Sequence, residues 1–141
     1  MEWPWVAAWR WLRGGPDVRE ARAQFARQRE HLEANFFQAA SHSGKPRGLR
    51  WKGCEWGSGV TFARERATGK LAALVGVTIR FEAVAGGDME GLPAVGNLRH
   101  ASAVFFFDRG RWHTVGRAIF NLAPDEALEH FKNQYQRLEA T

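Results

Sequence analysis

Cysteine, tyrosine and long apolar runs are all scarce in this 141-residue chain, and each scarcity excludes a class of protein. The one cysteine, Cys54, excludes an internal disulfide and leaves no metal-ligand spacing. No stretch approaches the roughly 18 consecutive apolar residues of a membrane span. Glu2 and Arg10 interrupt the apolar N-terminus, which is not typical of a signal peptide. We therefore expect a cytoplasmic protein, in contact with a membrane only at its periphery if at all.

Bulky aromatic side chains are abundant instead, with seven Trp and ten Phe against one Tyr. Four of the Trp lie within residues 1–13, where they alternate with arginines in the manner of an interfacial anchor. A simpler interpretation is that these side chains cap the protein's own core or a second copy of the chain. The hypothesis of an N-terminal interaction segment names Trp3, Trp5, Trp9 and Trp11.

The positive charge is local. The net charge is +5, and residues 41–70 alone hold seven basic and two acidic residues, a surplus of five. Basic residues interleaved with Trp51 are typical of nucleic-acid contacts, but no recognition motif accompanies them. A charged edge strand explains them more simply. Nucleic-acid binding therefore ranks third among our hypotheses, and its candidate patch is Lys45, Arg47, Arg50 and Lys52.

Helical periodicity is clearest after the Gly14–Pro16 break. Asp17 and Glu20 have the spacing of a capping box. Apolar residues then recur at helical spacing from Val18 to Ala39, and the Gly and Pro that follow Ser43 oppose continuation. The pattern predicts an amphipathic helix of about six turns.

Alternation of period two predicts the strands. The clearest strand is expected over residues 71–84, where every odd position is apolar, as is typical of a strand with one buried face. We expect residues 60–66 to pair with it across a two-residue loop at Thr68-Gly69, so that Phe62 faces Val75 and Val60 faces Val77. We also expect a strand over residues 49–56. Its register stays open, because Trp51 and Trp56 fall on opposite parities, although a bulge at Gly53 would place both on one face.

A second hairpin is expected over residues 100–121, turning at Arg109-Gly110. Its register pairs Phe107 with Trp112 and Ala101 with Ala118 on one face. On the other face it pairs Phe106 with His113, Val104 with Val115, Ser102 with Arg117, and His100 with Ile119.

Pro124 suits the first turn of a closing helix, whose apolar stripe is Leu128, Phe131, Tyr135 and Leu138. The expected architecture is an α+β domain over residues 14–141, with four or five antiparallel strands and both helices on the sheet's apolar face. Its element order resembles that of cystatin-like and NTF2-like rolls, and the resemblance implies a fold and no function.

The second face of the predicted sheet carries the candidate ligand or partner residues. A polar cluster with histidines can polarise a substrate or bind an anion, although an antiparallel sheet commonly leaves one face in water. The same face holds enough apolar surface to need a cover, which could be the Trp segment, a second copy, another protein or a small ligand. The candidates are Arg80, Glu82, His100, Ser102, Phe106, His113 and Arg117.

No catalytic set is recognisable. Cys54 lacks the spacing of a known nucleophile, and Asp88 and Glu90 in the long 85–97 connection lack the further oxygen ligands of a cation site. We expect no metal and no cofactor. The leading hypothesis is a non-enzymatic interaction module for self-association, a protein partner or a membrane surface. A small-ligand-binding or enzymatic roll is the alternative.

Overall fold

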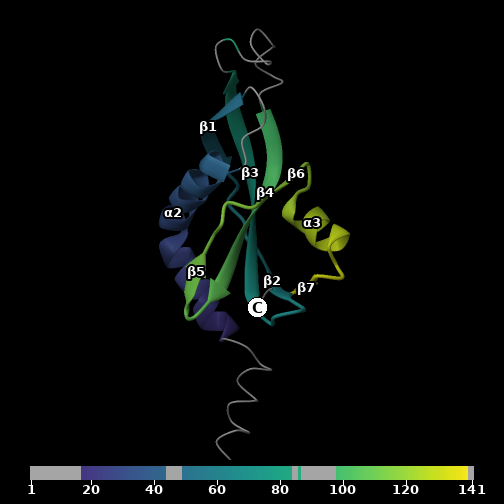
Figure 1. Ribbon diagram of the computed structural model, residues 1–141. Coiled ribbons are helices and arrows are strands. Elements are labelled where there is room, and N and C mark those ends of the chain that lie inside the picture. Colours follow the sequence, from purple (N-terminus) through teal and green to yellow (C-terminus); the bar gives the residue numbers. More distant parts are fainter. Residues whose placement is uncertain (1–16, 44–48, 84–85, 87–97, 140–141) are drawn as a thin grey trace, which may run out of the picture.

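The computed structural model places an antiparallel sheet between a long helix and a short one (Figure 1). It describes residues 17–43, 49–83, 86 and 98–139, so the predicted Trp segment and most of the 85–97 connection lie outside the described residues. The elements are, in chain order, α2 (Val18–Ser43), β1 (Leu49–Trp56), β2 (Thr61–Glu65), β3 (Leu71–Ala83), β4 (Leu98–Asp108), β5 (Arg111–His113), β6 (Ala118–Phe120), α3 (Pro124–His130) and β7 (Tyr135–Arg137).

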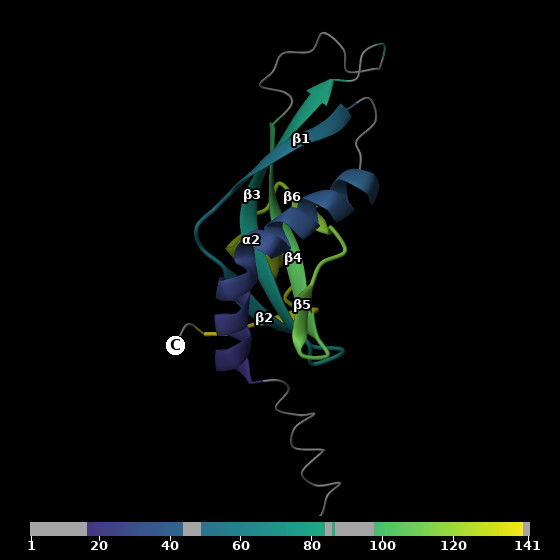
Figure 2. The same cartoon turned by 90° about the vertical axis from the view of Figure 1, so that its left-hand side faces the viewer.

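The predicted N-terminal helix is confirmed. A carboxylate oxygen of Asp17 accepts hydrogen bonds from the main-chain N–H groups of Arg19 and Glu20 at 3.0 and 3.4 Å, so Asp17 caps the first turn. Residues at helical spacing then turn to the sheet and are buried there: Ala21, Phe25, Leu32, Phe36 and Ala40. Figure 2 shows α2 lying across this face, which we call the α2 face.

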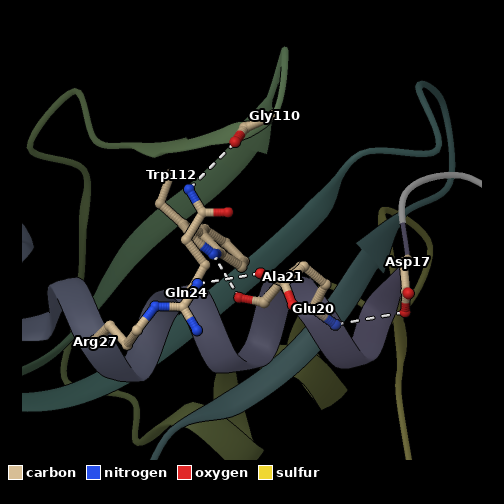
Figure 3. Close-up of polar contacts among 7 residues, drawn as sticks. All are labelled: Asp17, Glu20, Ala21, Gln24, Arg27, Gly110 and Trp112. Carbon is tan, nitrogen blue, oxygen red and sulfur yellow. Dashed lines mark hydrogen bonds and ion pairs between the residues drawn. The ribbon is translucent and has the colours of Figure 1, made fainter.

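The core under α2 is aromatic. The ring of Phe25 meets those of Phe62, Phe105 and Trp112 edge-on, with centroids 5.8, 5.4 and 5.1 Å apart. Such pairs contribute about 0.5–1.5 kcal/mol each beyond the area they bury. The indole N–H of Trp112 also donates to the carbonyl of Ala21 at 2.8 Å, which fastens the β5 hairpin to the helix (Figure 3).

The strand over residues 71–83 is confirmed, with its odd positions on the α2 face. The register of its hairpin with β2 is wrong by two residues. Phe62 faces Ala73, not Val75, and Trp56 of β1 occupies the position opposite Val77. The cause is a four-residue loop closed by Glu65 and Lys70, in which the Gly69 N–H donates to the Glu65 carbonyl at 2.8 Å. A shift of two residues leaves every side chain on its predicted face.

The second hairpin is confirmed only near its turn, where Phe107 faces Trp112 and Phe106 faces His113. Residues 114–117 then leave the ladder, and pairing resumes with Ala101 opposite Phe120 and Ser102 opposite Ile119. The predicted pairs of Ala101 with Ala118, Val104 with Val115, Ser102 with Arg117 and His100 with Ile119 are therefore wrong. Gly116 explains the irregularity, because it has φ +80° and runs so close to α2 that a Cβ there would lie 2.5 Å from the Ala40 nitrogen.

The strand over residues 49–56 is confirmed together with its bulge. Trp51 faces Phe81, whereas Gly53 faces Arg80, so Lys52 is the extra residue. The bulge changes the parity of the strand. As a result both Trp51 and Trp56 pack on the α2 face against Phe36, with ring centroids 6.2 and 5.3 Å away.

The closing helix is shorter than predicted and lies on the opposite face. α3 ends at His130, and the following residues turn and form β7, which pairs with β2. Tyr135 and Leu128 do not belong to the α2-face core but pack, with Leu74, Val104 and Ile119, in a second cluster. We call this side the α3 face; Figure 1 shows the two helices on opposite sides of the sheet. The chain's own C-terminal segment, which the sequence placed on the other face, therefore covers part of this one and was not among the covers considered.

Candidate functional site

The seven predicted residues of the second face do not form one site, because α3 lies across the middle of that face. Ser102 lies beneath it with 0% exposure, and its hydroxyl donates to the Leu122 carbonyl at 2.7 Å. That bond satisfies a buried polar group and anchors the segment leading into α3. Ser102 is therefore structural.

On one side of α3 lie Phe106, His113 and Arg117. The imidazole of His113 stacks on Phe106 at 5.4 Å, and its Nε2 lies 3.2 Å from the Asp108 carbonyl. Arg117 donates to the Tyr135 hydroxyl at 3.2 Å. A cavity of about 200 Å³ lies here, lined by Phe106 and Arg117 but not by His113. Val115 borders it and is 68% exposed.

On the other side, Arg80 and Glu82 lie near the end of β3. Arg80 donates to the Glu55 carboxylate at 2.8 Å, and both side chains are at least half exposed. Glu82 is exposed opposite Arg50 across the β1–β3 ladder. An exposed ion pair stabilises a protein by at most about 1 kcal/mol. This side of the face is therefore exposed to water, and its positive and negative side chains balance each other.

The predicted residue with the most room around it is His100, which lines a hollow of about 600 Å³. Glu55 of β1 faces Thr78 of β3, and Thr78 faces His100 of β4, so three strands present one row of polar side chains. In the ladder next to this row, Gly76 contributes no side chain, which deepens the hollow. We call this site the His100 hollow.

The walls of the His100 hollow come from the loop before α3 and from the β1–β2 connection. Asn121 adopts φ +67°, and its N–H donates to the His100 carbonyl at 2.8 Å, which turns the chain toward the α3 face. The carboxylate of Glu126 accepts from the Ala123 N–H at 2.9 Å. Opposite, Gly57 donates to the Gly76 carbonyl at 2.8 Å. Glu55 and Glu126 line this hollow, and no Lys or Arg does so in the part of the chain that the structure describes.

The most reactive arrangement in the His100 hollow is a hydroxyl beside an imidazole. Oγ1 of Thr78 lies 3.0 Å from Nδ1 of His100. A nucleophile–base pair also needs a third group that orients the base. No group among the described residues is hydrogen-bonded to Nε2 of His100. The pair can therefore donate and accept hydrogen bonds to a ligand, but it lacks the parts of a nucleophilic triad.

Cys54 lies half-buried on β1. Burial, and secondarily the charge of Glu33, raises the pKa of its thiol to about 11. A thiol with a raised pKa stays protonated near neutral pH and is a poor nucleophile. Within the described ranges, no three His, Cys, Asp or Glu side chains come together in a way that would hold a metal ion.

The candidate basic patch is described only in part, because Lys45 and Arg47 lie outside the described residues. Arg50 and Lys52 are exposed on β1, which pairs with β3 alone among the described strands. Charged side chains and a bulge on an outer strand are features that protect an edge from further pairing. The Trp3, Trp5, Trp9 and Trp11 segment is outside the description, so its role stays a prediction.

No family model, curated protein or solved structure matches this chain. The resemblance in element order to cystatin-like and NTF2-like rolls therefore stays an expectation. Among the helices that the structure describes, none has the length and apolarity needed to cross a membrane.

The sequence pointed to His100 but missed Glu55, Asn121 and Glu126. The alternation along β3 does put Thr78 on the same face as Arg80 and Glu82. Only the registers of β1 and β4 against β3 place Thr78 beside Glu55 and His100, and no local sequence signal specifies those registers.

Proposed function

We propose that this chain is a binding domain for a small, positively charged ligand, and that the ligand occupies the His100 hollow. The observation that carries the proposal is the row formed by Glu55, Thr78 and His100 along a hollow of about 600 Å³. Ligand sites commonly have volumes of about 300–1,000 Å³ and combine apolar walls with a few convergent polar groups.

The charge of the lining selects the ligand class. Glu55 and Glu126 bring two carboxylates, and within the described ranges no Lys or Arg side chain lines the hollow. Glu55 is already paired with Arg80, but both partners are exposed, so a competing ammonium group can replace that contact at small cost. Thr78, His100 and Asn121 add polar groups with hydrogen-bond acceptors for an amine.

The shape of the hollow is supported by contacts that do not depend on a ligand. Arg29 of α2 donates to the main-chain carbonyls of Gly57 and Ser58, the latter at 2.8 Å, which holds the β1–β2 connection in place. The Ser102–Leu122 bond does the same for the opposite wall. A site held in this way loses little conformational entropy on binding.

The test is a titration of the ¹⁵N-labelled chain with 1,4-diaminobutane, followed by amide chemical shifts. We expect shifts at Gly76, Thr78 and His100 that saturate, and that Glu55→Gln weakens. Glu82→Gln is the matched control, because it removes the same charge from an exposed position on β3 that does not line the hollow. Equal weakening by both variants, or no saturable shift, would refute the proposal.

A further inference from the structure

A second concave site lies between α2 and β5, on a different part of the surface. It is a groove of about 410 Å³ and shares no lining residue with the His100 hollow. We call it the Arg27 groove. Its polar lining is Arg27, Gln28, His31 and Asn35 from α2, with Arg111 and His113 from β5.

The geometry of the groove follows from how α2 sits on the β5 hairpin. Arg27, His31 and Asn35 are spaced four residues apart, so they form one stripe along the helix. Two bonds hold this part of the helix to the hairpin (Figure 3). The Trp112 indole donates to the Ala21 carbonyl at 2.8 Å, and the Gln24 amide donates to the Gly110 carbonyl at 3.2 Å. The two walls are therefore fixed relative to each other.

The described lining of the groove is rich in hydrogen-bond donors. Among the residues that the structure describes, its ionisable groups are two arginines and two histidines, with neither Asp nor Glu. Within the part of the chain that the structure describes, the side chains of His31, Asn35 and Arg111 make no hydrogen bond or ion pair. They can therefore bind a ligand without breaking a bond of the fold.

Two of the lining residues have contacts of their own. Arg27 forms an ion pair with Glu20 at 3.1 Å, but the two side chains are 62% and 63% exposed. Arg27 can therefore exchange Glu20 for a ligand with little loss of stabilising free energy. His113 is more firmly held by its stack on Phe106 and by the Asp108 carbonyl. The principal charges offered to a ligand are thus the guanidinium groups of Arg27 and Arg111, one from each wall.

We infer that the Arg27 groove binds a small molecule carrying a diphosphate group. A guanidinium presents a planar fork of N–H donors that matches two oxygens of one phosphoryl group. Two guanidiniums on opposite walls therefore suit two linked phosphoryl groups, with His31 and the amides of Gln28 and Asn35 as further donors. The volume is that of a small-molecule site. A nucleic-acid strand would need exposed stacking rings, whereas Trp112 is buried.

The test is calorimetric titration of the full chain with inorganic pyrophosphate at low ionic strength. We expect saturable one-site binding that the double variant Arg27→Gln/Arg111→Gln weakens at least about tenfold, since hydrogen bonds to charged groups are among the strongest polar contacts. The control Arg19→Gln/Arg137→Gln removes the same charge from exposed positions outside the groove, and should retain the wild-type affinity. Circular dichroism checks that both variants fold.

Location and ligand class are tested separately. Amide shifts on adding pyrophosphate should appear at His31, Asn35 and Arg111 and not at Thr78 or His100. The variant Glu55→Gln should leave pyrophosphate binding unchanged, so failure of the cation proposal and failure of this one are distinguishable. No pyrophosphate binding, equal losses in the two double variants, or equally tight binding of citrate overturns the inference.

Discussion

Replacing Gly116 by alanine tests whether α2 packs directly against the irregular segment of residues 114–117. Gly116 has φ +80°, and a Cβ there would meet the Ala40 nitrogen at 2.5 Å and the Ala39 carbonyl carbon at 2.8 Å. The left-handed conformation costs an alanine about 1–2 kcal/mol, offset in part by about 0.4–1 kcal/mol because alanine restricts the unfolded chain. Overpacking against the helix backbone adds about 1–3 kcal/mol. We therefore expect Gly116→Ala to lower the free energy of unfolding by about 3 kcal/mol, within a range of about 1–5 kcal/mol.

Gly69→Ala isolates the steric part of this effect. Gly69 has φ +77°, nearly the same as Gly116, but nothing lies within 4 Å of a Cβ built there. This variant should lose only the conformational part, about 1 kcal/mol. Urea unfolding of both variants gives the difference directly if the dependence on denaturant is unchanged. Equal losses for the two variants would show that α2 does not pack closely against Gly116, and the explanation of the irregular β4 pairing would fail.

Two further predictions concern the thiol and the α3 face. Burial raises the pKa of Cys54 from 9.0 to about 11, so the rate of alkylation by iodoacetamide should keep rising to about pH 11 in the folded chain but level off near pH 9 in urea. The raised pKa favours folding below pH 9, and this contribution is lost as the pH rises through 11; a folded-state midpoint near 9 would contradict the burial. Leu128→Ala should cost about 2–5 kcal/mol in urea unfolding, because Leu128 is buried in the α3-face cluster. Glu129→Ala on the exposed side of the same helix should cost little, and similar losses for both would show that α3 does not cover the sheet.

Several elements of the fold could be predicted because their signals are local. The capping residue Asp17 and the spacing of Ala21, Phe25 and Phe36 depend only on helix geometry. The alternation along residues 71–83 likewise specifies a strand and its buried side. The bulge beside Gly53 was one way to place Trp51 and Trp56 on one face, but the register of their strand could not be fixed from the sequence.

The strand registers were harder to predict from the sequence, because they depend on the geometry of the connecting loops. The turn after Glu65 contains four residues and not two, since the Thr68 hydroxyl donates to the Glu65 carboxylate at 2.7 Å and the Gly69 N–H to the Glu65 carbonyl. The interruption at Gly116 arises from a helix nearly 80 residues earlier in the chain. Both errors were of two residues, which preserves the alternation and explains why the faces were still predicted correctly.

The candidate site likewise has one part that the sequence could predict and another part that it could not. The sequence alone placed His100 on the second face and indicated that this face is largely apolar, because both follow from the alternation along one strand. The sequence also required that something cover that face, but several covers satisfy the same pattern. Only the tertiary structure decided that α3 is the cover, that Ser102 lies buried beneath it and that Glu55, Thr78 and His100 form one row. The physical reason is that burial and periodicity are properties of a single segment. Register and the choice of the covering element instead depend on differences in packing free energy between segments that lie far apart in the chain.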